Sequence, residues 1–219
     1  MKDYKSRSAL ALKVIAVLEK LYPDSVALCS LVYLKPHELM IAARLSAQCT
    51  DERVNKVTPA LFEKYKSISD FAAADPLDIE KYIYSCGFYH SKAADIVGMC
   101  KKIEEDFNGI IPERMEDLLS LPGIGRKTAN LIRGDIYDLP AVVCDTHCIR
   151  ISNRLSLSDS KIPEKCEDQL REILPPEKSN DFCHRIVLFG RDFCRSQNPK
   201  CDICPLAHIC PSRPNFFDK

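Results

Sequence analysis

Apolar and polar positions alternate with a helical period along most of the chain. The first apolar stripe predicts a helix that ends near Tyr22 and comprises Leu10, Val14, Val17, Leu18 and Leu21. Similar patterns predict further helices over about 37–47, 51–62, 68–73, 77–84, 92–107, 112–121, 126–137, 145–155, 163–173 and 179–189. Residues 140–144 are the one extended segment, too short to found a sheet. We therefore predict an all-α fold.

Proline, glycine and small polar residues mark the expected helix ends. Pro36 precedes the second helix, and Thr50 is a candidate cap for the third. We expect Ser91 to cap the helix over 92–107 and Pro112 to open the next one. Gly190 is expected to close the helix that starts at 179.

Composition is that of an ordinary globular protein. The chain has 219 residues, 46% hydrophobic and 28% charged, with 31 basic and 31 acidic residues. Many nucleic-acid-binding proteins have an excess of basic residues, and this chain does not. If it binds nucleic acid, the positive charge must be concentrated in local segments. No apolar run approaches the roughly 18 residues that span a bilayer, and we expect no membrane partner.

Four of the twelve cysteines cluster near the C-terminus with the spacing C-x6-C-x2-C-x5-C, namely Cys194, Cys201, Cys204 and Cys210. No secretory signal is evident, so we predict a cytoplasmic protein with reduced thiols, where clustered cysteines indicate metal. Four thiolates at this spacing favour an iron–sulfur cluster. Structural zinc, with His208 as a substitute ligand, is the alternative. The other eight cysteines are scattered singly.

The segment that leads up to and between the first two of these cysteines is basic. Residues 185–200 contain four basic residues and one acidic residue, a balance of +3, from Arg185, Arg191, Arg195, Lys200 and Asp192. A metal centre that fixes this loop would present it to phosphate. The alternative is an ordinary solvated surface.

Residues 121–129, Leu-Pro-Gly-Ile-Gly-Arg-Lys-Thr-Ala, join two predicted helices. Gly123 and Gly125 are expected to allow positive φ and a close approach of phosphate. Amides at the start of the following helix would bind that anion. The pattern resembles the helix–hairpin–helix DNA-binding motif, whereas an ordinary corner between helices is the alternative.

Lys127 and Asp145 are the candidate catalytic pair. Lys127 lies in the first turn after the hairpin, where the helix dipole, Arg126 and partial burial would favour a neutral amine. A neutral lysine forms Schiff bases. Asp145 is a candidate helix cap, and a carboxylate there could also accept a proton or stabilise a cationic sugar. Spacing alone does not bring the two together. A surface lysine that contacts phosphate is the alternative.

Together these segments resemble the endonuclease III family of DNA glycosylases over about residues 8–210. The resemblance includes the hairpin, the four-cysteine tail, and the segments at 45–48, 51–56, 87–93 and 143–147. It implies two helical domains with DNA in the cleft between them: a six-helix barrel over 23–136, and a cluster domain formed by 1–22 and 137–219.

The resemblance further implies a monomeric, bifunctional glycosylase and AP lyase that excises oxidised pyrimidines from double-stranded DNA and cleaves abasic sites. Lys127 is the implied nucleophile, Asp145 its carboxylate, and a [4Fe-4S] cluster the implied cofactor. Gln48 would fill the gap left by a flipped nucleotide and Phe88 would wedge beside it. The expected DNA contacts are Gln48, Phe88, Gly123, Gly125, Arg126, Thr128, His147, Arg195 and Lys200.

Other interpretations remain open from the residues alone. Gln48 could cap a helix end, and Phe88 could lie in the core. A monofunctional mismatch glycosylase would lack the lysine at 127, and a redox-sensing iron–sulfur DNA-binding module would need neither Lys127 nor Asp145. The sequence departs from the family's usual pattern at Phe88, often leucine, and at Cys49 and Cys148, where extra thiols are open to oxidation.

Overall fold

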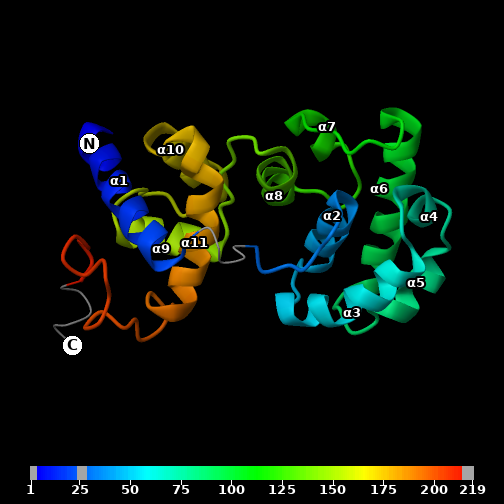
Figure 1. Ribbon diagram of the computed structural model, residues 1–219, viewed down its shortest axis with the longest axis horizontal. Coiled ribbons are helices and arrows are strands. Elements are labelled where there is room, and N and C mark those ends of the chain that lie inside the picture. The colour runs from blue at the N-terminus through cyan, green and yellow to red at the C-terminus, as the bar shows by residue number, and fades with distance from the viewer. Residues whose placement is uncertain (1–3, 24–28, 214–219) are drawn as a thin grey trace. The chain divides into compact units, whose positions relative to one another are not determined.

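The computed structural model describes residues 4–23 and 29–213, and within those ranges its regular structure is helical throughout. Its contacts divide the chain into two compact units, Cys29–Asp138 and the pair Met1–Leu28 with Leu139–Lys219 (Figure 1). The expected limits, 23–136 for the first domain, differ from this grouping by a few residues at each end. No helix in the described ranges is long and apolar enough to span a membrane.

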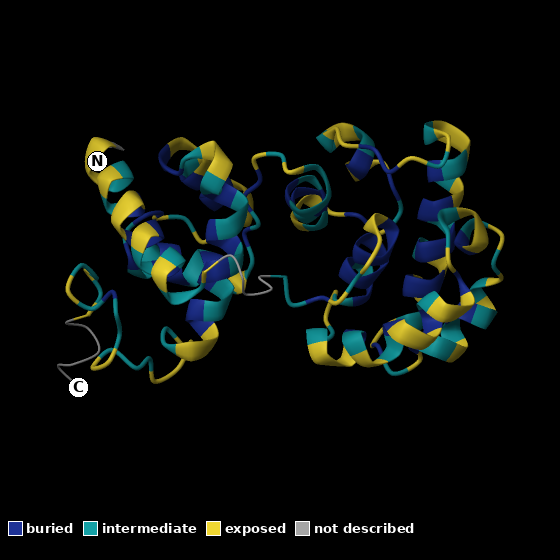
Figure 2. Cartoon of the chain, viewed as in Figure 1, coloured by how far each residue is buried: buried dark blue, intermediate teal, exposed yellow. Residues whose placement is uncertain are grey.

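The unit of residues 29–138 holds seven helices: α2 (Pro36–Leu45), α3 (Asp51–Lys64), α4 (Ile68–Ala72), α5 (Pro76–Ile83), α6 (Tyr89–Phe107), α7 (Met115–Leu119) and α8 (Arg126–Tyr137). Helix α6 packs against α2, α4 and α5, and α8 packs against α2 and α7. Buried and exposed residues alternate along α6 in Figure 2, as its amphipathic sequence requires. The expected six-helix barrel stays a prediction.

The second unit holds α1 (Tyr4–Leu21), α9 (Thr146–Arg154), α10 (Pro163–Ile173), a 3-10 turn (Pro176–Lys178) and α11 (Ser179–Asp192). Helix α11 packs against α1 and α9, and α1 also packs against α10. The core is apolar, with Leu18, Ile151, Leu170 and Phe189 among its buried side chains. The N-terminal helix therefore belongs with the C-terminal part of the chain.

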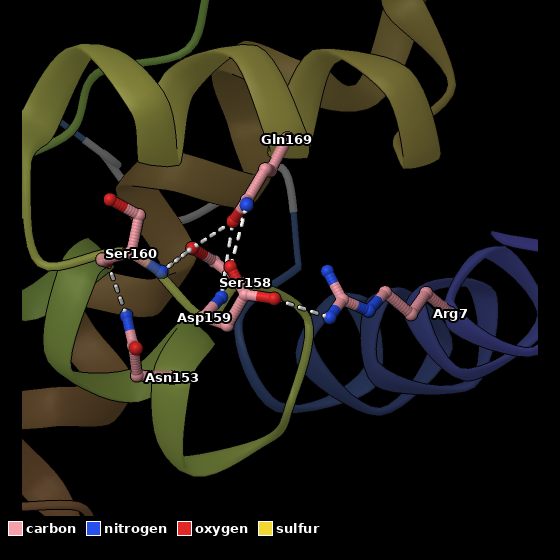
Figure 3. Close-up of polar contacts among 6 residues, drawn as sticks. All are labelled: Arg7, Asn153, Ser158, Asp159, Ser160 and Gln169. Carbon is pink, nitrogen blue, oxygen red and sulfur yellow. Dashed lines mark hydrogen bonds and ion pairs between the residues drawn. The ribbon is translucent and has the colours of Figure 1, made fainter. Parts of the chain in front are cut away.

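A polar network fixes the loop between α9 and α10 (Figure 3). Gln169 on α10 accepts from the Ser158 hydroxyl at 2.7 Å and donates to Asp159 at 2.6 Å. Arg7 of α1 pairs with the same Asp159 at 2.8 Å, and Asn153 of α9 donates to the Ser160 carbonyl at 2.8 Å. These bonds connect the consecutive helices α9 and α10 to α1, which lies far from them in the sequence.

Three expected helix ends were wrong. Ser91 lies inside α6, whose N-cap is Phe88. Helix α7 begins at Met115 rather than at Pro112. Gly190 lies inside α11 and does not end it. A Cβ at Gly190 would lie 2.4 Å from His147 Nδ1 and 2.9 Å from Ile151 Cδ1, so this glycine permits α9 to approach α11 closely.

Candidate active site and cluster loop

Helix α8 begins at the hairpin as expected. Its N-cap is Gly125, whose extended backbone has φ −97° and which has no side chain to cap the first amides of α8. Uncapped amides at the start of a twelve-residue helix favour an anion. Arg126 and Lys127 are exposed in this first turn, and Thr128 is half-buried. The predicted position of Lys127 is confirmed, but its predicted partial burial is wrong.

The two hairpin glycines differ, and positive φ was wrongly expected at Gly125. Gly123 has φ +73°, whereas Gly125 has an ordinary backbone with nothing within 4 Å of the place for a Cβ. A Cβ at Gly123 would lie 2.5 Å from Arg44 Nε and 2.9 Å from Asp95 Cβ. Gly123 is thus required by the packing of its own unit. Gly125 offers the open approach that phosphate needs.

An ion pair lies under the hairpin. Arg44 of α2 donates from Nε and Nη2 to Asp95 of α6, at 2.8 and 2.5 Å. Gly98 of α6 lies against the Pro122 ring, since a Cβ there would be 3.4 Å from Pro122 Cγ. Sequence reasoning missed these supports, because Arg44 and Asp95 are 51 positions apart.

Gln48 follows α2, and Phe88 directly precedes α6 of the same unit. Both have left-handed backbones, with φ 54° and 59°. Such conformations are uncommon for residues with a side chain and are concentrated at functional sites. Phe88 is 68% exposed, which excludes the core alternative, and Gln48 is exposed beyond the end of α2.

A buried lysine supports the Gln48 segment. Lys92 is 1% exposed, and its ammonium donates to the Leu45 carbonyl at 2.8 Å, at the end of α2. Burial lowers its pKa. Sequence reasoning missed this role, because a lysine in an amphipathic helix is ordinarily exposed.

Asp145 caps α9, as predicted. Its Oδ1 accepts from the Cys148 amide at 2.7 Å, and the side chain is only half-buried. A carboxylate has two oxygens, so capping is compatible with a second role. His147 lies in the first turn of α9, and its Nδ1 is 3.2 Å from Arg150 Nη2.

The opposite end of α9 holds the cysteine loop. Arg154 donates to Cys194 Sγ at 3.3 Å, to the Arg195 carbonyl at 2.7 Å and to the Ser196 carbonyl at 2.9 Å. Arg150 donates to the Cys194 carbonyl at 3.0 Å. These arginines belong to a helix about 40 residues earlier in the chain, and sequence reasoning missed them.

The four predicted ligands line one pocket, with apolar walls from Ile151, Leu155, Phe189 and Leu206. The donor set is four cysteines, and His208, the substitute zinc ligand, is not among the residues that line the pocket. Four thiolates are a common ligand set of an iron–sulfur cluster, so these residues fit that group. Burial raises the pKa of Cys204 to about 11, so binding here must displace thiol protons.

The basic segment is smaller than its composition indicated. Arg185 is 3% exposed and donates to the Tyr22 carbonyl and to Asp181, so its contribution to a surface charge was wrongly counted. Arg195 is exposed, and Lys200 is half-buried beside the cysteine pocket. These two residues remain candidates for phosphate contact.

The eight other cysteines are free thiols and do not all stand alone. In the second unit, Cys144, Cys148, Cys166 and Cys183 are all buried in the same core. The neighbouring thiols, together with burial, raise the pKa of Cys144 and of Cys166. They pack as small apolar residues in the core.

Comparison with known proteins agrees with this geometry. Residues 41–176 match the HhH-GPD superfamily of base excision DNA repair proteins, and residues 194–210 match the iron-sulfur binding domain of endonuclease III, which spans all four clustered cysteines. Endonuclease III of Synechocystis sp. is 44% identical over 97% of this chain and 96% of its own length. That of Bacillus subtilis is 41% identical over 83% and 84%.

Solved structures give the same result. A non-covalent endonuclease III–DNA complex superposes with a TM-score of 0.89 at 37% identity and covers 100% of both chains. A trapped covalent endonuclease III–DNA intermediate has a TM-score of 0.87 at 38% identity, over 98% of this chain and 99% of that one. On the family profile, the iron–sulfur domain and the full-length relatives together, this chain belongs to the endonuclease III family of base-excision DNA repair proteins.

Proposed function

We propose that this chain, a DNA glycosylase and AP lyase of the endonuclease III family, removes oxidised pyrimidines from duplex DNA with Lys127 as its nucleophile and Asp145 as its carboxylate. One observation carries the proposal: Lys127 is exposed in the first turn of α8, directly beyond the uncapped amides at Gly125. An amine held beside a phosphate site is in position for a sugar.

DNA binding comes first in the proposed reaction. Phosphate approaches the open side of Gly125 and the first amides of α8. Arg195 and Lys200 add positive charge in the other unit, and Arg126, Thr128 and His147 are further proposed contacts. Gln48 and Phe88, both exposed, take the space of the nucleotide that is turned out of the stack.

The chemistry then follows at the sugar. The Lys127 Nζ lone pair attacks C1′, the bond from C1′ to the base breaks, and the base leaves as its anion, which takes up a proton. Asp145 stabilises positive charge on the sugar and accepts the amine proton. Ring opening gives an imine, and loss of the C2′ proton expels the 3′ phosphate by β-elimination.

We propose that Cys194, Cys201, Cys204 and Cys210 hold a [4Fe-4S] cluster. The cluster would supply a rigid anchor for the loop that carries Arg195 and Lys200. Arg154 supports the same loop from α9, because it binds the carbonyls at the start of the loop. We further propose that one copy of the chain suffices, since both catalytic residues and all four thiols are its own. The expected compartment is the cytoplasm, with nucleoid association if the source is bacterial.

Borohydride trapping tests the nucleophile. The wild-type protein should form a covalent adduct with an abasic-site duplex, because reduction fixes the imine, and Lys127→Gln should abolish it. Arg126→Gln, the adjacent exposed side chain, is the matched control and should retain the adduct with weaker binding. An adduct that persists in Lys127→Gln would remove Lys127 from the mechanism. Base release without any adduct in the wild type would indicate a monofunctional glycosylase.

A further inference from the structure

Two further cysteines flank the residues proposed to enter the DNA. Cys49 directly follows Gln48, and Cys86 precedes Phe88 by two positions. The two segments are neighbours in the fold, because a Cβ at Gly87 would lie 3.9 Å from the Gln48 carbonyl oxygen. Burial and the nearby Cys49 thiol raise the pKa of Cys86 to about 11, which agrees with this proximity. Cysteines 37 positions apart are thus brought close together.

The surroundings hold both cysteines in place. The Cys49 amide donates to the Ser46 carbonyl at 3.1 Å, and the Cys86 amide to the Ile83 carbonyl at 2.8 Å. Beneath them Lys92 is fixed to the Leu45 carbonyl, and its charge interacts with both thiols. Both cysteines therefore lie at helix ends whose backbones are neighbours, and a disulfide requires cysteines that the fold places close together.

We propose that Cys49 and Cys86 are a thiol modification site: they form a reversible disulfide that joins the segment of Gln48 to the segment of Phe88. The disulfide itself stands on the proximity of the backbones at Gln48 and Gly87, which each adjoin one of the cysteines. Its consequence for catalysis rests on the proposed function, which assigns those two segments to the opening of the DNA.

Different exposure gives the two thiols different roles. Cys49 is partly exposed and is the entry point for an oxidant such as glutathione disulfide, whereas Cys86 is fully buried. The Cys49 thiolate attacks one glutathione sulfur, forms a mixed disulfide and expels one glutathione thiolate. Cys86 then loses its proton, attacks the Cys49 sulfur and expels the second glutathione. The two protein thiols lose two electrons, and glutathione disulfide gains them.

The crosslink would fix two segments that must adapt to DNA. Gln48 and Phe88 each have a left-handed backbone, one residue before Cys49 and two residues after Cys86. A bond between the sulfurs would hold the spacing of the free protein. The hairpin at 121–129 lies outside the stretch 49–86 that the disulfide would close, so its proposed phosphate contact should persist. Oxidised protein should therefore bind duplex DNA as before but release a damaged base about tenfold more slowly.

Peptide mapping tests the disulfide. Trypsin cuts after Arg44 and Arg53 and after Lys81 and Lys92, which gives peptides 45–53 and 82–92 with one cysteine each. After treatment of the cluster-loaded protein with glutathione disulfide, an unreduced digest should contain these two peptides joined, and dithiothreitol should separate them. Glutathione on Cys49 without the joined species would overturn the proposal.

The kinetic test uses matched variants. Single-turnover base release should slow in the oxidised wild type and recover with dithiothreitol, while Cys49→Ser and Cys86→Ala should be insensitive to oxidant. Unchanged visible absorbance of the iron–sulfur cluster confirms that oxidation is confined to thiols. A joined peptide with an unchanged rate would overturn the catalytic consequence. Absence of base release from the reduced wild type would instead refute the proposed function and leave the peptide test intact.

Discussion

The two glycines of the hairpin illustrate what single residues contribute. Gly123 has positive φ, and its missing side chain makes room for the ion pair of Arg44 and Asp95. Gly125 has ordinary φ and open space on its missing side chain. The first glycine therefore serves the fold of the unit, and the second lies at the proposed approach of phosphate.

Alanine at these two positions should separate stability from DNA binding. Gly123→Ala should destabilise the protein by about 2–4 kcal/mol, because it adds left-handed strain to a steric overlap. Gly125→Ala should leave stability within about 0.5 kcal/mol. Urea unfolding measures both. Equal loss of stability in the two variants would contradict the assignment.

The same pair should behave in the opposite way toward DNA. Gly125→Ala should weaken binding to an abasic-site duplex about tenfold, equal to about 1.4 kcal/mol, since a methyl group would occupy the approach of phosphate. Fluorescence anisotropy at fixed salt measures the affinity. Binding as tight as that of the wild type would show that phosphate does not approach this side of the hairpin.

At the scale of elements, α9 connects two functions within one unit. Its N-terminus is capped by Asp145, the proposed catalytic carboxylate, and its last residue, Arg154, binds the start of the cysteine loop. Gly190 lets α9 lie against α11 without intervening side-chain bulk. One short helix thus fixes the position of the carboxylate relative to the cluster loop.

Two substitutions of Asp145 should separate its cap from its chemistry. Asp145→Asn keeps an oxygen for the Cys148 amide and should retain wild-type stability, whereas Asp145→Ala should lose about 1 kcal/mol. Both should lose most base release, because neither supplies a carboxylate. Thermal unfolding and single-turnover kinetics measure the two effects. An active Asp145→Asn variant would reduce this residue to a structural cap.

On the scale of the whole molecule, the N-terminal helix is held by residues near the other end of the chain. Arg7 pairs with Asp159, and Tyr22 donates to Asp192 at 2.7 Å, across 170 positions. Lys178 pairs with Glu19 at 2.8 Å. These contacts close one unit from two distant stretches of sequence.

The Arg7–Asp159 pair should make a small, pH-dependent contribution to stability. The hydrogen bond from Arg7 holds the pKa of Asp159 below its ordinary value of 3.8. A lowered pKa means that the folded state favours the carboxylate, so the contribution is present above about pH 4 and is lost as pH falls further. Because Asp159 is 65% exposed, we expect less than about 1 kcal/mol.

A double-mutant cycle with Arg7→Gln and Asp159→Asn checks this expectation. The coupling free energy, measured by urea unfolding, should be favourable at pH 7 and should fall toward zero as the pH drops through the lowered pKa of Asp159 and the carboxylate is protonated. A coupling that is independent of pH would show that the pair acts through packing rather than charge.

We could predict the helices, the hairpin and the cysteine spacing from the residues alone, because these features depend on residues close together in the chain. Amphipathic period predicted both limits of α8 and of α10, and the cap at Asp145 followed from one short polar residue before an apolar helix. The resemblance to endonuclease III rested on the same local motifs, and the comparisons confirmed the family.

The packing of whole helices sets what lies against those elements. Arg185 bonds to Tyr22, Arg154 holds the cysteine loop, and the segments of Cys49 and Cys86 lie side by side, so that each case joins residues tens of positions apart. The hydrophobic pattern does not predict these contacts, because an arginine or a cysteine can lie either on the surface or in the core. Which neighbour each one meets is fixed by how whole helices pack, and that depends on the entire chain.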